Sequence, residues 1–355
     1  MSQLYFNRSS FFKYLIFLIF LPFEIIHLVL DLIKYKFFKI NNSEKSFQTF
    51  LKLFLISGGF TNNLVHKFLS KKKKSFICND KKNKENLINN EKNYVFFDSE
   101  GYFLKENFIS DNDLDKIRQF LNHQLGYYRS ENLAGSERKL TKLDSKNPAA
   151  VAFHYQSSNL LESIEIQNLL INYEILEFVQ TYLGSLPIID LVECWWSFPT
   201  SKPDKEVAQM WHFDMDRPKW VKVFFFLEDC NVNNGPHCFI KGSHKDNILP
   251  FNIRKKGYSR IEDRTIEKLF KRENEKIFTA NKKTILFEDT RGLHKGQRVE
   301  SGKRLMLQFQ YSSSLFGANT KKISFPGNSS NKFLNFKNNN KEIFSNFVEK
   351  NYSDS

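Results

Sequence analysis

The region after Pro187 constrains the fold most, because it carries six short apolar or alternating runs separated by Pro, Gly, Asn and Asp. Runs of this length with turn residues between them are typical of a β-sandwich or barrel, and a jelly roll is the version we expect. The six predicted strands cover residues 188–198, 207–215, 221–228, 236–241, 284–288 and 304–312.

Helical patterns precede these strands. We expect one helix over residues 111–125, where apolar residues recur at helical spacing, and a second over residues 164–183 that ends at Gly184. Residues 94–108 are expected to be extended, with a turn in the middle. The chain is therefore expected to be an α+β protein in which helices flank a jelly roll.

The composition excludes two other classes of protein. The 38 Phe, 13 Tyr and 4 Trp are too many aromatic residues for a disordered chain. The four cysteines form no Cys-x-x-Cys pair, so they indicate no disulfide scaffold and suit a reducing compartment. We therefore expect a cytoplasmic protein, with peripheral attachment to a membrane left open.

The net charge of +14 is concentrated at one end of the chain. Residues 1–75 hold 12 Lys plus Arg against 3 Asp plus Glu. A nucleic-acid reader would be expected to use Arg, yet the chain has 41 Lys and only 12 Arg, so no nucleic-acid partner is expected. A coding sequence rich in A and T would also produce an excess of lysine.

Residues 1–75 are apolar as well as basic. The run Tyr14–Phe23 is followed by Glu24, His27, Asp31 and Lys34, whose spacing of 3, 4 and 3 predicts an amphipathic helix with a narrow polar stripe. The uninterrupted run is ten residues long, whereas a bilayer span needs about 20. No small-residue cleavage site follows it, which disfavours a signal peptide.

Three interpretations of this helical extension stay open. It could anchor the protein on an anionic membrane surface, with lysines on the head groups. It could instead form a helical hairpin that packs on the rest of the protein or on a second copy, or it could contain a true spanning helix. Residues 76–93 are charged and rich in Asn, which predicts a linker.

A candidate metal site lies within the predicted strands. His212 and Asp214 are two residues apart, so in a strand both side chains face the same side. A histidine and a carboxylate are two thirds of the facial triad that binds non-heme Fe(II). His294 precedes the last predicted strand and is placed to be the third ligand. Arg304 opens that strand, and its guanidinium could bind a carboxylate with two hydrogen bonds.

Three further segments resemble the phytanoyl-CoA dioxygenase family: Asp98–Ser110, Val221–Asp229 and Asn234–His244. The resemblance covers about residues 94–316. It implies an Fe(II)- and 2-oxoglutarate-dependent oxygenase on a double-stranded β-helix, the cupin-like form of the jelly roll. It also implies that O₂ is consumed and that 2-oxoglutarate is decarboxylated to succinate.

By position, the resemblance implies that His212, Asp214 and His294 are the iron ligands. It also implies that Arg304 binds the distal carboxylate of 2-oxoglutarate. Because the carboxylate ligand is present, hydroxylation or a related oxidation is favoured over halogenation. The expected substrate is a small-molecule or lipid-like metabolite. Asp216 shares the strand parity of the ligands, so it is a candidate contact for the substrate.

Two other functions remain as alternatives. One is a non-catalytic, membrane-associated binding protein on the same barrel, and the other is a cupin-type metalloenzyme that does not use 2-oxoglutarate. The predicted organisation is a helical extension over 1–75, the linker over 76–93, the oxygenase domain over 94–320 and a polar tail over 321–355. Neither the oligomeric state nor the substrate follows from the sequence.

Overall fold

The computed structural model describes residues 11–73, 90–136, 138–144, 151–327 and 329–350, and for residues 11–20 it gives the backbone alone. Its α-helices are α1 (Phe11–Phe38), α2 (Glu44–Ser57), α3 (Phe60–Leu69), α4 (Glu91–Glu100), α5 (Asp111–Asn122), α6 (Ile164–Leu170), α7 (Tyr173–Leu183), α8 (Phe251–Arg254), α9 (Asp263–Glu267) and α10 (Asn331–Asn339), and short 3₁₀ turns cover Glu131–Leu133, Ser157–Glu162 and Arg272–Asn274.

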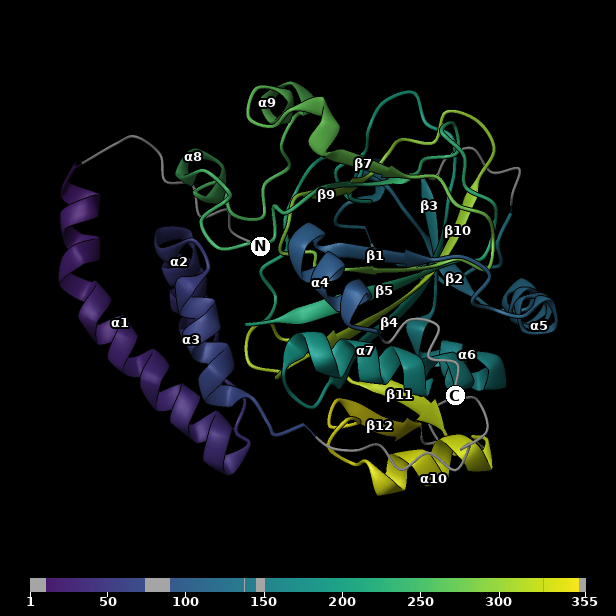
Figure 1. The fold of residues 1–355 in the computed structure, drawn as a ribbon, viewed down its shortest axis with the longest axis horizontal. Helices are drawn as coiled ribbons and strands as arrows, with labels where there is room; N and C mark the ends of the chain where they lie inside the picture. The colour runs from purple at the N-terminus through teal and green to yellow at the C-terminus, as the bar shows by residue number, and fades with distance from the viewer. Residues whose placement is uncertain (1–10, 74–89, 137, 145–150, 328, 351–355) are drawn as a thin grey trace.

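The strands form two facing sheets and one small accessory sheet (Figure 1). The larger sheet has seven antiparallel strands in the order β1-β8-β5-β10-β4-β3-β2, and the smaller has the order β7-β6-β9. The strands are β1 (Tyr102–Lys105), β2 (Gly126–Arg129), β3 (Ala152–Tyr155), β4 (Ile188–Ser197), β5 (Trp220–Phe226), β6 (His237–Ile240), β7 (Glu275–Phe278), β8 (Ile285–Glu288), β9 (His294–Gly296), β10 (Arg304–Ser312), β11 (Ile323–Pro326) and β12 (Phe347–Lys350).

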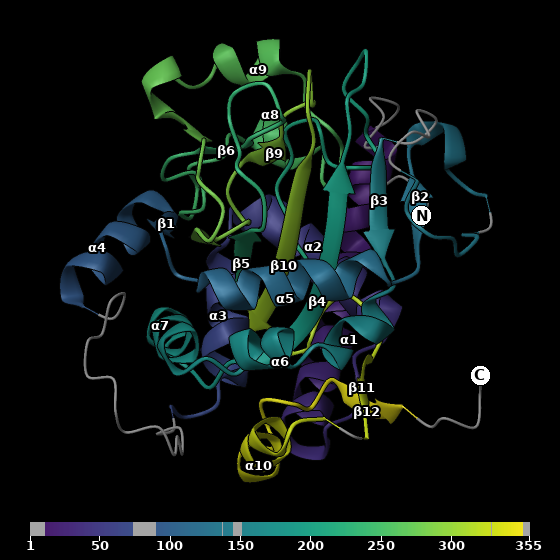
Figure 2. The same cartoon turned by 90° about the vertical axis from the view of Figure 1, so that its right-hand side faces the viewer.

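This arrangement confirms the predicted jelly roll with flanking helices. Figure 2 shows α5 and α6 lying across β10 and β4. Alternation along β10 explains the packing, because Leu305, Leu307 and Phe309 belong to the hydrophobic core shared with these helices. The intervening residues, beginning with Arg304 and Met306, therefore face the interior of the barrel, where the functional site is built.

Two predictions of secondary structure need correction. Residues 94–100, which were expected to be extended and to enter a turn, belong to α4, because Asn90 caps the helix at Asn93 N and Gly101 ends it with a φ of 86°. The helix expected over 164–183 is divided into α6 and α7, because the side chain of Asn172 accepts a hydrogen bond from Ile175 N and starts a new helix. Gly184 ends α7 as expected.

The run expected as a strand over 207–215 forms only isolated bridges. Trp211 pairs with Ile261, and His212 pairs with His294. The segment is still held beside β9, because His212 N donates to His294 O at 3.0 Å and His294 N donates back to His212 O at 2.9 Å. These two bonds bring together parts of the chain that are 82 residues apart in the sequence.

The helices α1, α2 and α3 pack against the segment that carries His212 and Asp214. The rings of Phe54 and Phe213 lie 6.0 Å apart, and those of Phe50 and Phe316 lie 6.1 Å apart. These rings belong to one hydrophobic cluster that includes residues of α1–α3 and the segment from Trp211 to Met215. No helix in the described part of the chain combines the length and apolar character needed to cross a bilayer.

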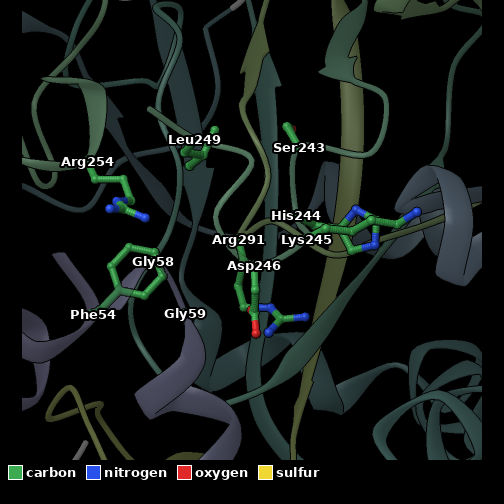
Figure 3. Close-up of a pocket in the computed structure, with 10 residues that line it drawn as sticks. All are labelled: Phe54, Gly58, Gly59, Ser243, His244, Lys245, Asp246, Leu249, Arg254 and Arg291. Carbon is green, nitrogen blue, oxygen red and sulfur yellow. The ribbon is translucent and has the colours of Figure 1, made fainter. Parts of the chain in front are cut away.

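The turn between α2 and α3 fits closely against the loop before α8 (Figure 3). Gly58 has a φ of 65°, and a Cβ atom there would overlap the side chains of Arg254 and Asn247. Asn247 N donates to Gly58 O at 2.8 Å. A glycine is therefore favoured at this point, where the extension contacts the loop before α8.

The segment expected as a polar tail is largely structured. Residues 323–350 form β11, α10 and β12, and they bury Phe325, Phe333 and Phe344 against the main core. Both views place α10, β11 and β12 beneath α6 and α7 (Figures 1 and 2). Most of the predicted linker over 76–93 lies outside the described residues.

Candidate metal centre

The side chains of His212, Asp214 and His294 converge at one point inside the barrel. One potential ligand atom from each lies within 4.8 Å of the other two. The three residues are buried, with exposed fractions of 6%, 9% and 4%, respectively. The described residues therefore contain a compact donor set of two imidazoles and one carboxylate.

Backbone hydrogen bonds orient both imidazoles in the same way. The Nδ1 atom of His212 lies 2.8 Å from Met210 O, and that of His294 lies 3.0 Å from Gly292 O. A carbonyl oxygen can only accept, so Nδ1 carries the proton in each ring. The unprotonated Nε2 atoms are then available as metal ligands, and the hydrogen bond from Nδ1 fixes the orientation of each ring.

A backbone hydrogen bond also positions Asp214, the third residue of the donor set. Asp214 N donates to Thr290 O at 2.8 Å. This bond ties the segment that carries His212 and Asp214 to the loop that leads to His294. On the same loop, Thr290 Oγ1 accepts a hydrogen bond from Trp220 Nε1 at 2.8 Å. The donor set is thus built on paired backbone segments rather than on free loops.

The surroundings favour the protonation states that a metal requires. Burial lowers the pKa of both His212 and His294, which keeps the imidazoles neutral. Burial opposes ionisation of Asp214, but the positive charge of Lys222 and the hydrogen bond that it donates hold the pKa of that carboxyl below its ordinary value. Neutral imidazoles and an ionised carboxylate are the ligand forms for a divalent cation.

Lys222 is a close neighbour of the centre that the sequence analysis did not single out. It lies on β5, and its Nζ atom donates to Asp214 Oδ2 at 2.7 Å. Its position in the apolar run Trp220–Phe226 is the signal that could have revealed it, because this one lysine lies on the same strand face as Phe224 and Phe226, which face the barrel interior. The charge of Asp214 raises the pKa of Lys222 against the effect of burial.

His237 and Glu288 form a second buried pair beside the centre. His237 Nε2 lies 3.0 Å from Glu288 Oε1, and the ring of His237 lies 5.7 Å from that of His294. Burial raises the pKa of Glu288 to about 8 and lowers the pKa of His237 to about 3. The pair is therefore neutral at pH 7, with the proton on Glu288.

Arg304 lies at the start of β10 and is 6% exposed. One guanidinium nitrogen donates to Gly235 O, and Nη2 lies 3.4 Å from Ser197 Oγ. Its Nε atom is buried and has no hydrogen-bond partner among the described residues. Gly296 leaves room for the guanidinium, because a Cβ atom there would lie 3.1 Å from Nη2. A buried guanidinium with no carboxylate partner and an unused donor suits an anionic ligand.

Asp216 follows Asp214 by two residues in the chain. Its Oδ1 atom accepts a hydrogen bond from Tyr258 Oη at 3.1 Å. Burial, followed by the charge of Asp214, raises the pKa of Asp216 to about 6. The two carboxyl groups are thus electrostatic neighbours.

Two other buried residues, Arg217 and His244, lie outside the donor set. Arg217 turns away and forms a buried pair with Asp190, with Nε–Oδ2 and Nη2–Oδ1 distances of 2.7 and 2.8 Å. His244 lies 3.1 Å from Asp98 O through Nε2, so it ties the loop after β6 to α4. Neither side chain belongs to the metal-binding group.

A comparison with protein families identifies one match. The model of the phytanoyl-CoA dioxygenase (PhyH) family matches residues 97–303, which contain the three converging residues and end just before Arg304. No curated protein matches the sequence.

Solved structures with a similar fold include iron- and 2-oxoglutarate-dependent proteins at low identity. EctD from S. alaskensis with bound Fe is 13% identical, with a TM-score of 0.48, over 72% of this chain and 89% of that one. HygX from Streptomyces hygroscopicus, with nickel and 2-oxoglutarate bound, is 14% identical, with a TM-score of 0.46, over 67% of this chain and 91% of that one. The epimerase SnoN from nogalamycin biosynthesis, with Fe³⁺ and α-ketoglutarate, is 15% identical, with a TM-score of 0.46, over 62% and 82%.

Proposed function

Because the chain belongs to the phytanoyl-CoA dioxygenase family of iron- and 2-oxoglutarate-dependent oxygenases, we propose that it hydroxylates a C–H bond of a small organic substrate at a centre formed by His212, Asp214 and His294. The convergence of these three buried side chains carries the proposal. Two neutral imidazoles and one carboxylate match the facial triad of non-heme Fe(II) enzymes, which leaves positions open for other ligands.

When bound, iron and 2-oxoglutarate supply the oxidation: O₂ and 2-oxoglutarate are converted to succinate and CO₂, and one oxygen atom enters the substrate. The protein orients the reactants. His212 and His294 present Nε2 because their Nδ1 atoms bond backbone carbonyls, and Lys222 holds the carboxylate of Asp214 in place.

Arg304 is the proposed partner of the distal carboxylate of 2-oxoglutarate. It is supported by its burial and by its unused Nε donor. A guanidinium binds a carboxylate through two parallel hydrogen bonds, so it selects a dicarboxylate whose second end reaches the metal. Asp216 is the proposed contact for the substrate, because it neighbours Asp214.

The test is the turnover of 2-oxoglutarate without added substrate. Purified full-length protein with Fe(II), ascorbate and 2-oxoglutarate should form succinate slowly, and His212→Ala should abolish this activity. His123→Ala is the matched control, because His123 lies exposed at the end of α5. Absence of succinate from the wild-type protein, or unchanged formation in His212→Ala, would refute the proposal and favour a binding protein or a different metalloenzyme.

We also propose that the protein works at an anionic membrane surface. On α1, Phe23, Ile26, Leu30, Ile33 and Phe37 are all exposed, and their spacing of 3, 4, 3 and 4 places them on one helix face. The rings of Phe23 and Phe37 are 67% and 66% exposed. Figure 1 shows that α1 lies at the outer edge of the molecule, with α2 and α3 between it and the barrel. A continuous exposed apolar stripe of this kind marks an interaction surface.

A second stripe lies on α3, where Phe60, Leu64 and Phe68 are exposed at intervals of four residues. The two stripes approach each other at Lys36, whose Nζ atom lies 4.1 Å from the centre of the Phe68 ring. Together they form an apolar surface that the described part of the protein does not cover.

Charge decides between a lipid surface and a second copy of the chain. Lys34 and Lys36 lie beside the α1 stripe. Glu24 is paired with Lys52 at 2.8 Å, and the buried Asp31 lies 3.6 Å from Lys34. Pairing two α1 stripes would bring these lysines close together, which is unfavourable. Anionic head groups would neutralise them while the acyl boundary covers the phenylalanines.

Sedimentation with vesicles tests this proposal. The full-length protein should bind phosphatidylserine-containing vesicles and not pure phosphatidylcholine vesicles. The double variant Phe23→Ser/Phe37→Ser should lose binding, whereas Val232→Ser, which alters another exposed apolar residue, should not. Failure of the wild-type protein to bind anionic vesicles, or a dimer in solution that the double variant abolishes, would contradict the proposal.

A further inference from the structure

A cavity of about 380 Å³ lies between the end of β2 and the loop that follows it. Its lining includes Arg129, Ser130, Arg138, Lys139 and Glu206. None of these residues belongs to the metal centre, and the family resemblance assigns no role to any of them. The size of the cavity suits part of a small organic molecule.

The charged lining of the cavity is predominantly positive. Arg129, Arg138 and Lys139 contribute three cations, and Glu206 contributes one carboxylate. Arg129 Nη2 lies 3.9 Å from Glu206 Oε2, which is too far for a hydrogen bond. The guanidinium of Arg129 therefore keeps donors that can serve an anionic ligand.

An unused hydroxyl group provides an independent sign of a ligand. Ser130 is 3% exposed and lines the cavity, yet its Oγ atom has no hydrogen-bond partner among the described residues. Buried hydroxyl groups are normally paired, so an unpaired one in a cavity that Arg129 and Arg138 also line indicates a missing partner.

A wall of aromatic rings runs from the cavity into the barrel. Arg138 lies 4.9 Å from the ring centre of Tyr127. The rings of Tyr127 and His154 are stacked at 5.8 Å, and those of His154 and Trp195 are also stacked at 5.8 Å. Trp195 packs on the interior cluster that contains Phe224.

The same wall reaches the metal centre. The ring of Phe224 lies 5.1 Å from that of His237, which in turn lies 5.7 Å from His294. The charges of Arg129 and Arg138 also extend into the barrel, where they counteract the burial that raises the pKa of Glu193. A series of ring contacts therefore links the edge of the cavity to the metal centre.

We propose that this cavity binds the anionic group of the substrate, so that the substrate is an organic oxyanion whose apolar body lies along the aromatic wall towards His294. The proposal rests on the proposed oxygenase function and adds the chemical class of the substrate. A carboxylate and a phosphate ester present the same oxyanion chemistry to Arg129, Ser130 and Arg138.

Calorimetric titration of the metal-free, full-length protein tests the cavity without relying on turnover. Inorganic pyrophosphate and hexanoate are the two probes, and tighter binding of one identifies a phosphate or a carboxylate as the preferred group. The double variant Arg129→Ser/Arg138→Ser should weaken binding of the preferred probe at least about tenfold, since hydrogen bonds to charged groups are lost.

Two control variants locate the effect. Arg272→Ser removes an exposed arginine elsewhere and should leave probe binding unchanged. Arg304→Leu should also leave it unchanged, because Arg304 is the proposed partner of 2-oxoglutarate and does not line the cavity. The circular dichroism spectrum and the melting temperature of the double variant should match those of the wild-type protein, which would show that this variant is folded.

Two results would overturn the proposal: no binding of either probe at millimolar concentrations, or equal binding by the wild-type protein and the double variant. Loss of probe binding in Arg304→Leu would also overturn it, because the oxyanion would then occupy the 2-oxoglutarate position. If the wild-type protein forms no succinate, the oxygenase function fails, whereas the titration still reports on the cavity.

Discussion

The Nζ atom of Lys222 lies 2.7 Å from Oδ2 of Asp214, so a buried lysine holds the one carboxylate of the proposed iron site. The contact keeps the carboxylate ionised and limits its rotation. It also balances part of the negative charge that Asp214, Asp216 and Glu193 bring into the barrel, since all three interact electrostatically with Lys222.

Replacement of Lys222 should therefore weaken metal binding. We expect Lys222→Met to lower the affinity for Co(II), used as an oxygen-stable substitute for Fe(II), by about 10- to 100-fold, as is usual when a hydrogen bond to a metal ligand is lost. Calorimetry at pH 7 measures the affinity. Lys276→Met, on the exposed part of β7, is the control. An unchanged affinity in Lys222→Met would show that the lysine does not support the carboxylate.

Arg304→Leu should impair the use of 2-oxoglutarate and spare the metal. Loss of a buried, hydrogen-bonded charge pair costs roughly 2–5 kcal/mol, so KM for 2-oxoglutarate should rise at least about 30-fold. Arg304→Lys keeps the charge but not the two-pronged geometry and should recover only part of the loss. Steady-state succinate formation measures KM, and equal KM values in wild type and Arg304→Leu would exclude the assigned role.

Phe54→Ala should destabilise the docking of the helical extension. Phe54 is 6% exposed and contacts Phe213, which lies between two proposed ligands. Truncation of a buried phenylalanine costs about 3–5 kcal/mol. The melting temperature and the affinity for Co(II) should both decrease. Phe60→Ala, at a side chain that is 58% exposed, should alter neither. A melting temperature equal to that of wild type would show that the extension is not packed here.

Asp289 should make stability depend on acidic pH. Burial opposes its ionisation, but Arg291 and Tyr182 outweigh that effect and lower the pKa of Asp289 to about 2 from an ordinary value of 3.8. Because the folded-state pKa is the lower one, the stabilisation is complete above about pH 4 and is lost as the pH falls towards 2.

The loss between pH 4 and pH 2 should amount to about 2 kcal/mol for this carboxyl. Urea unfolding of the metal-free protein at several pH values measures it. Asp289→Asn is the comparison: it should be less stable at pH 7, because Arg291 loses its buried partner, and its stability should vary less between pH 4 and pH 2. A variant with the same acid dependence as the wild type would show that another group is responsible.

The sequence was most informative where a local pattern and chain order agreed. The spacing of His212 and Asp214 and the position of His294 predict one site, and the structure brings these side chains within 4.8 Å. The strand expected over 304–312 has the same bounds as β10. The alternation of buried and exposed side chains along a strand depends only on consecutive residues, so it can be recognised without knowledge of the fold.

Other features depend on contacts between distant segments. Lys222 and Asp214 meet only because β5 and the segment before it fold back on each other, and His237 meets Glu288 across 51 residues of sequence. Residues 91–100 resemble a strand in their apolar character but are helical, since caps at Asn90 and Gly101 set the backbone. No spacing rule connects Arg138 to Tyr127 and the aromatic wall behind it.

The most direct measurement is a crystal structure of the protein with Mn(II) and 2-oxoglutarate, prepared without oxygen. We expect the metal on Nε2 of His212, a carboxylate oxygen of Asp214 and Nε2 of His294, with the distal carboxylate of 2-oxoglutarate on Arg304. A metal bound through His237 and Glu288, or a 2-oxoglutarate molecule whose distal carboxylate lies away from Arg304, would contradict the account.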